Sequence, residues 1–195
     1  LIGLWGIKGP FNPYYGDENL LNRYLLNVYY KHMKLQENGT FSAGWSYYSG
    51  GDALSTLSTY MPFYLYGKKV PAKLHKAWYD TIAPLIDRFG MDRVGCENQT
   101  AHWLVDLECM YKSGAGKVYG DMARNFAEYL CLPKYNPYQK AGYLQENYAV
   151  DATYNGLSAC NVAYYYAISG DPNAKGALSR IYDLFNHTVA KEPDG

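Results

Sequence analysis

Charged and uncharged stretches of helical length alternate along this chain. Four stretches place charged residues on one side and apolar residues on the other, which is typical of helices with one face in solvent: 17–36, 71–89, 117–131 and 173–190. Three stretches between them carry little or no charge: 52–66, 98–112 and 152–168. A helix without a polar face is usually buried, so these three are predicted to lie inside the protein.

The connections between these expected helices alternate in length. A long connection precedes each uncharged helix, at 37–51, 90–97 and 132–151, and a short turn follows it. The charged helices recur at roughly 50 residues, which indicates repeated helical hairpins. A double ring with uncharged helices inside and charged helices outside satisfies both patterns. We therefore predict an all-α fold, an α/α toroid, with the long connections at one end of the ring.

The same arrangement predicts where a binding site would lie. The N-termini of the inner helices point towards the long connections, and their potential favours anions at that end. The repeats do not complete a ring, because the last charged stretch is not followed by another uncharged one. We expect residues 1–195 to be a single α/α-toroid domain from a longer chain, with further segments or domains as partners.

Composition narrows the class of protein. The net charge is zero, which argues against a nucleic-acid interface or a basic membrane surface, and no apolar run reaches the roughly 20 residues of a membrane helix. The 23 tyrosines far outnumber the 6 phenylalanines and 4 tryptophans, and their flat rings with a hydroxyl suit sugar-binding walls as well as core packing. The four cysteines lack a CxxC spacing, which argues against a zinc site and leaves buried thiols or up to two disulfides as alternatives. We expect no metal and no cofactor. Glycosylation-type triplets at Asn38, Asn98 and Asn186 favour a secreted or periplasmic protein.

The most informative stretch is the beginning of the uncharged helix near residue 98. Asn98 or Thr100 is expected to cap this helix, and Asn98 and His102 lie four residues apart on one face. Trp103 follows directly. Polar groups at the mouth of a buried helix need either partners in the protein or a ligand. His102 is therefore either a hydrogen-bonded core residue or part of a site.

A second informative stretch is 142–156, at the start of the last uncharged helix. Asp151 or Thr153 is expected to cap this helix, which places Tyr154 in its first turn. Tyr154 should then lie at the same level as His102 on the neighbouring inner helix. A tyrosine there can donate or accept a proton, or its hydroxyl can simply bond to a neighbouring helix.

These two stretches resemble motifs of one enzyme family. The run from Glu97 to Trp103 is similar to the Asn-His…Trp opening of an inner helix in alginate lyases and heparinase-like lyases with an α/α toroid. The run from Asp151 to Gly156 looks like the later segment that carries the catalytic tyrosine of those enzymes. The lyases have histidine directly after the asparagine, where this chain has Gln99, so His102 would have to replace it. The resemblance implies a polysaccharide lyase acting on a uronic acid polymer.

The chemistry of such a lyase assigns a role to each residue. In β-elimination the proton beside the carboxylate is removed and the substituent on O4 leaves. We expect Asn98 to neutralise the carboxylate, Tyr154 to act as base or acid, and His102 to be its partner in proton transfer. We expect the substrate to contact eight further residues: Trp45, Tyr47, Tyr48, Glu97, Gln99, Trp103, Tyr143 and Glu146.

Two other functions fit the same pattern. An inverting glycoside hydrolase on the same toroid would need two carboxyl groups roughly 6.5–9.5 Å apart, and Glu97, Glu146 and Asp151 are the candidates at the loop end. A non-catalytic glycan-binding module could use the same tyrosine-lined surface. Elimination yields an unsaturated uronide and hydrolysis does not, so the products distinguish the two enzymes.

Overall fold

The protein is all-α in the part that the computed structural model describes. That part comprises residues 2–33, 76, 79, 97–146, 149 and 151–188. Its helices are α1 (Ile2–Gly6), α2 (Glu18–Met33), α5 (Glu97–Lys112), α6 (Lys117–Cys131), the 3₁₀ helix η2 (Pro137–Ala141), α7 (Ala152–Ser169) and α8 (Pro172–Thr188). Within these ranges the only β-type pairing is an isolated bridge between Glu146 and Ala149. The expected helix 52–66 and most of 71–89 lie outside the described residues.

The N-terminal segment contains one helix more than the sequence predicted. The first helix expected from the charge pattern was 17–36, but α1 forms before it. The side-chain amide of Asn12 donates to the backbone oxygens of Leu4 and Ile7, both at 2.6 Å, and so supplies partners for carbonyls at the end of this short helix. The expected start of the next helix is confirmed, since Asp17 Oδ1 accepts from the backbone N–H of Asn19 at 2.8 Å.

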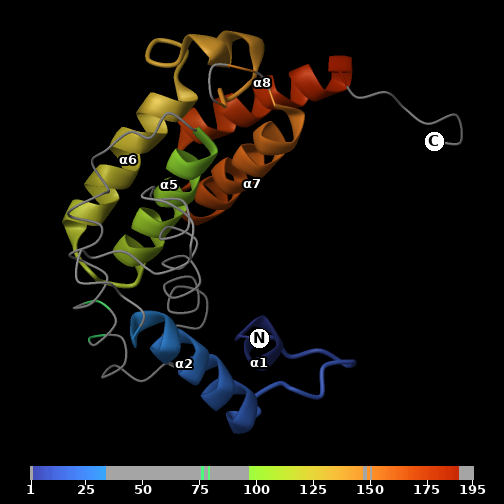
Figure 1. Ribbon diagram of the computed structural model, residues 1–195. Helices are drawn as coiled ribbons and strands as arrows, with labels where there is room; N and C mark the ends of the chain where they lie inside the picture. Colours follow the sequence, from blue (N-terminus) through green and yellow to red (C-terminus); the bar gives the residue numbers. More distant parts are fainter. Residues whose placement is uncertain are drawn as a thin grey trace, which may run out of the picture.

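Helices α5 to α8 form two packed hairpins (Figure 1). α5 packs against α6 and also against α7, while α8 packs against α7 and α6. One layer is therefore α5 and α7, and the other is α6 and α8. This arrangement of hairpins agrees with two neighbouring repeats of the predicted ring, and the ring as a whole stays a prediction.

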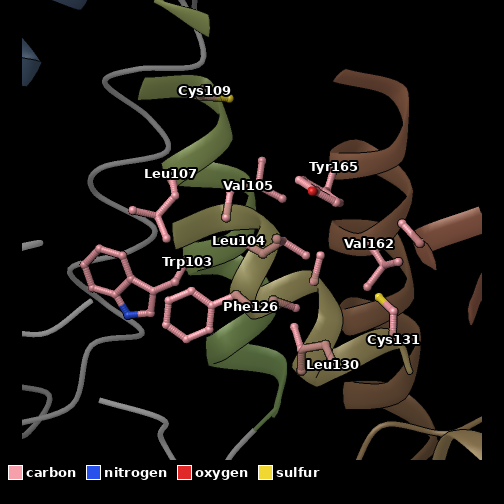
Figure 2. Close-up of a cluster of buried hydrophobic side chains, with 14 of the residues drawn as sticks. Trp103, Leu104, Val105, Leu107, Cys109, Phe126, Leu130, Cys131, Val162 and Tyr165 are labelled. Atoms are coloured by element: carbon pink, nitrogen blue, oxygen red, sulfur yellow. The ribbon is translucent and has the colours of Figure 1, made fainter. Parts of the chain in front are cut away.

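α5 is the buried centre of this assembly, as predicted from its low charge. All residues from Ala101 to Met110 are buried. Figure 2 shows its apolar side chains meeting those of α6 and α7, with Trp103 beside Phe126 and with Tyr165 pointing from α7 towards Val105. A helix enclosed on several sides can carry apolar residues around most of its circumference.

The charged helices α6 and α8 each have one buried face, which confirms their predicted class. α6 buries Tyr119, Ala123, Phe126, Ala127, Leu130 and Cys131, at the spacing of one helix face. Its bounds are those expected from the sequence. α8 buries Ala174, Ala177 and Ile181.

The prediction that α7 is mostly buried is wrong. Its buried residues are Asn155, Ser158, Asn161, Val162 and Tyr165, which form a single face. Away from that face Leu157 and Tyr164 are exposed. α7 packs against α5 and α8, which occupy only part of its circumference. An absence of charge permits burial but does not supply the neighbours that would cover the helix.

The connection between α6 and α7 lies at the N-terminal ends of both α5 and α7. The backbone N–H of Glu97 donates to the carbonyl oxygen of Gln145 at 3.1 Å, and the backbone N–H of Leu144 donates to Asn155 Oδ1 at 2.9 Å. Two adjacent residues therefore bind the first turn of α5 and the first turn of α7. The two helices begin at the same level, and this long connection lies where the sequence predicted it. The connections 37–51 and 90–96 lie outside the described residues.

Candidate functional site

The first turn of α5 is held by a buried glutamate. The helix begins at Glu97, before Asn98 and Thr100, so neither residue caps it as expected. The side chain of Glu97 accepts from the side-chain amide of Asn136 at 2.9 Å and from the backbone N–H of Gln145. Both partners lie in the connection between α6 and α7. Glu97 therefore ties that connection to α5, and both of its carboxyl oxygens have partners within the protein.

Burial changes the ionisation of this glutamate. Removal from water raises the pKa of Glu97 to about 7, against the opposing effect of the hydrogen bonds from Gln145 and Asn136, and the nearby Glu146 raises it further. At neutral pH the carboxyl group is then divided between its charged and neutral forms. This lowers the negative charge at an end of the protein where an anionic ligand is expected.

The raised pKa of Glu97 predicts a pH-dependent stability. The folded protein binds more protons than the unfolded chain between pH 4.5, the ordinary pKa of the group, and about pH 7. Its contribution to the free energy of unfolding should fall by about 3 kcal/mol across that window and level off above it. Urea unfolding at pH 5 and pH 8 measures this, with Glu97→Gln removing the difference.

The exposed Glu18 in the first turn of α2 provides the control for that experiment. Glu18→Gln should keep the same pH dependence as the parent protein. If the difference in the free energy of unfolding between the parent and Glu97→Gln were the same at pH 5 and pH 8, the assignment would be contradicted.

Asn98 and His102 lie on one face of α5 and are almost fully buried. Their exposed fractions are 8% and 5%. Asn98 Oδ1 accepts from the backbone N–H of Gln99 at 2.8 Å, while Nδ1 of His102 has no hydrogen-bond partner among the described residues. Burial lowers the pKa of His102, so its imidazole is neutral at pH 7 and can accept a proton.

The polar row continues one turn further to a fully buried aspartate. Asp106 lies four residues beyond His102, and neither of its carboxyl oxygens has a hydrogen-bond partner among the described residues. Burial raises the pKa of Asp106 well above its ordinary value of 3.8. Burial thus favours the neutral form of this carboxyl group, and the row Asn98, His102 and Asp106 combines an amide, an imidazole and a carboxyl group.

Tyr154 lies in the first turn of α7, as predicted. Asp151 caps this helix by accepting from the backbone N–H of Tyr154 at 2.9 Å. Tyr154 and Tyr165 are eleven residues apart, about three full turns, so they lie on nearly the same side of α7. Figure 2 shows that Tyr165 points towards α5. Tyr154 therefore lies on the α5 side of its helix, at the level where α5 begins, with 43% of its surface exposed.

The residues expected to contact a sugar polymer fall in different environments. Trp45, Tyr47 and Tyr48 lie outside the described residues. Trp103 is completely buried in the core, which leaves none of its surface for a ligand. The ring of Tyr143 is half-buried and lies against that of Tyr138, with 5.2 Å between the ring centroids.

Two further residues expected at the site are polar and half-buried. Gln99 Oε1 and Glu146 Oε2 are enclosed, and no described residue forms a hydrogen bond with either atom. Gln99 lies in the first turn of α5. Glu146 follows Gln145, whose carbonyl oxygen accepts from the backbone N–H of Glu97. Because both atoms are enclosed, neither is open to a ligand at this end.

Two residues that shape this end were not predicted from the sequence. Asn136 and Asn155 are buried, and their side chains hold the connection between α6 and α7 to both first turns. The local signal for Asn155 is a polar residue within an otherwise apolar helix. Asn136 precedes a proline in a loop, where asparagine is common, so its burial has no local signal.

Searches of the described residues add two findings. No group of three or more histidine, cysteine, aspartate or glutamate side chains is placed there to hold a metal ion. None of the described helices has both the length and the apolarity needed to cross a bilayer.

Comparisons with protein-family models, curated proteins and solved structures find no match for the chain.

Proposed function

We propose that this chain is a carbohydrate-active protein, a polysaccharide lyase that cleaves a uronic acid polymer by β-elimination. The observation that carries the proposal is the shared level of the first turns of α5 and α7, fixed through Gln145 and Leu144. Asn98 lies in the first turn of α5 and His102 one turn further along, while Tyr154 lies in the first turn of α7. A secreted or periplasmic location would suit a polymeric substrate.

The carboxylate of the substrate is the group that such a site must neutralise. Removing the adjacent proton moves negative charge onto the carboxylate, so donors aimed at it stabilise the transition state. Asn98 supplies an amide, and the parallel helices α5 and α7 both present their N-terminal ends here. The partly neutral Glu97 reduces repulsion of the substrate.

Proton transfer then requires a base and an acid. The base removes the proton beside the carboxylate, the carbon–oxygen bond at O4 breaks, and a carbon–carbon double bond forms between the two carbons. The leaving oxygen takes up a proton, so no other reactant is needed. Tyr154 is exposed to the substrate side and neutral His102 can accept a proton, which supports these two as the proton-transfer pair.

One observation favours hydrolysis as a second candidate. An inverting hydrolase needs one protonated and one ionised carboxyl group, and Glu97 has a pKa of about 7 with Glu146 close enough to raise it. Both oxygens of Glu97, however, accept hydrogen bonds from Asn136 and Gln145. A carboxyl group so engaged is less free to protonate a glycosidic oxygen, so elimination is the better-supported reaction.

Ultraviolet absorbance tests the proposal. Uronic acid polymers of different composition are incubated with the protein, and absorbance of the unsaturated product is followed with time. We expect an increase with at least one polymer, and Asn98→Ala should slow it by about 10²-fold or more. New reducing ends without this absorbance would indicate the hydrolase, and binding without any product would indicate a glycan-binding module.

A further inference from the structure

A pocket lies at the opposite end of α5 and α7 from the proposed lyase site. It has a volume of about 410 Å³ and is formed by the last turns of α5 and α7, the outer side of α6 and the first turn of α8. This volume falls within the range of roughly 300–1,000 Å³ common for small-molecule sites. Its charged lining residues are Glu108, Lys112, Arg124, Glu128 and Asp171.

The two cations of this pocket are already paired within the protein. Lys112 Nζ lies 3.5 Å from Glu108 Oε1 and 5.4 Å from the centre of the Tyr111 ring. Arg124 forms an ion pair with Asp121. Glu108 is the buried member of its pair, with 4% of its side chain exposed. Neither cation is therefore left as the natural partner of an anionic ligand.

Two carboxylates of the pocket have no such partner. Among the described residues no lysine, arginine or histidine forms an ion pair with Asp171 or Glu128. Asp171 is instead held in place by neutral donors, since its Oδ2 accepts from the Tyr165 hydroxyl at 2.9 Å and its Oδ1 from the backbone N–H of Asn173 at 2.8 Å. Its charge is fixed in position at the pocket wall.

The C-terminal ends of α5 and α7 also make the electrostatic potential in this pocket negative. α5 ends at Lys112 and α7 at Ser169, so both parallel helices present their negative ends to this pocket. α8 begins here and contributes a positive end, which the carboxylate of Asp171 already caps. The described residues hold no cluster suited to a metal ion. The ligand that this combination favours is an organic cation.

We propose that this pocket binds a small primary amine, whose ammonium group is held between Asp171 and Glu128. An ammonium group has three donors, which suits two carboxylates, one at the cap of α8 and one on α6. The proposal is independent of the lyase function, because it concerns other residues at the other end of the helices. It would give the protein a ligand of opposite charge to the uronic acid polymer.

Isothermal titration with putrescine tests the proposal, using the butanediol of equal length as the neutral control. We expect putrescine to bind and the diol to bind at least tenfold more weakly. Asp171→Asn keeps an oxygen that can accept from the backbone N–H of Asn173, and its amide nitrogen can donate to the Tyr165 hydroxyl in place of the bond that Asp171 accepts. It removes the charge, and it should weaken putrescine binding at least tenfold. Asp183→Asn, on an exposed part of α8 outside this pocket, should leave binding unchanged.

A second variant covers the case in which Asp171→Asn does not fold. Glu128 is exposed on α6, so Glu128→Gln should fold normally and should weaken putrescine binding at least threefold. Absence of putrescine binding at millimolar concentration, equal binding of the diol, or full binding by Glu128→Gln would each overturn the proposal. None of these results bears on elimination, so the two proposals fail separately.

Discussion

Replacing Tyr154 by phenylalanine should lower the rate of elimination by about 10²–10⁴-fold, because a general acid or base contributes a factor of that size. The substitution removes only the hydroxyl group. Since 43% of Tyr154 is exposed, the free energy of unfolding should change by no more than about 0.5 kcal/mol. The rate is measured from the ultraviolet absorbance of the product, and stability from urea unfolding of the same preparation.

Tyr164 provides a matched control on the same helix. It lies ten residues beyond Tyr154, on a different side of α7, and 55% of it is exposed. Tyr164→Phe removes the same group from a similarly exposed position, so the elimination rate should stay within about twofold of the parent. Equal rates for the parent and Tyr154→Phe would remove Tyr154 from the mechanism, and Glu97, Glu146 and Asp151 would become the candidates.

Gly142→Ala should be the most destabilising of the substitutions considered. Gly142 has a φ of 79°, which L-residues rarely adopt, and an added Cβ would overlap the carbonyl oxygen of Arg180 and lie 2.7 Å from its carbonyl carbon. The strain costs about 1–2 kcal/mol and the overlap with backbone about 1–3 kcal/mol more. We therefore expect a loss of about 3 kcal/mol or more in urea unfolding.

Gly170 separates the two causes of that loss. Its φ is 73°, almost the same as at Gly142, but a Cβ added there would meet no atom within 4 Å. Gly170→Ala should therefore cost only the strain, about 1–2 kcal/mol. Equal losses for the two variants would contradict the close approach of the η2 connection to α8.

Local sequence patterns predicted those helices whose bounds and buried face are determined by their own residues. α6 has its apolar residues at the spacing of one face, between a glycine and a Leu-Pro pair, and its bounds agree with the prediction. Asp17 and Asp151 were recognisable caps because a capping side chain binds within three residues of itself. The order of long and short connections predicted that α5 and α7 begin at the same end of the protein.

The remaining features depend on partners far along the chain. Glu97 starts α5 because Asn136 and Gln145, 39 and 48 residues away, donate to it. No local pattern marks this residue as structural, so it was predicted to contact substrate. The exposure of α7 likewise depends on which helices cover it. The candidate site was predictable to the level of helix ends, and the roles of Glu97 and Trp103 were not.

The most direct test of the central proposal is the mass of the products formed in heavy-oxygen water. Elimination adds no water to the cleaved bond, so its new non-reducing end is lighter by one water, and the new reducing end keeps the unlabelled glycosidic oxygen. Hydrolysis places an oxygen from water on the new reducing end. We predict this unlabelled, lighter product from an active uronic acid polymer. Incorporation of one heavy oxygen atom for each bond cleaved would show hydrolysis and would contradict the proposed lyase function.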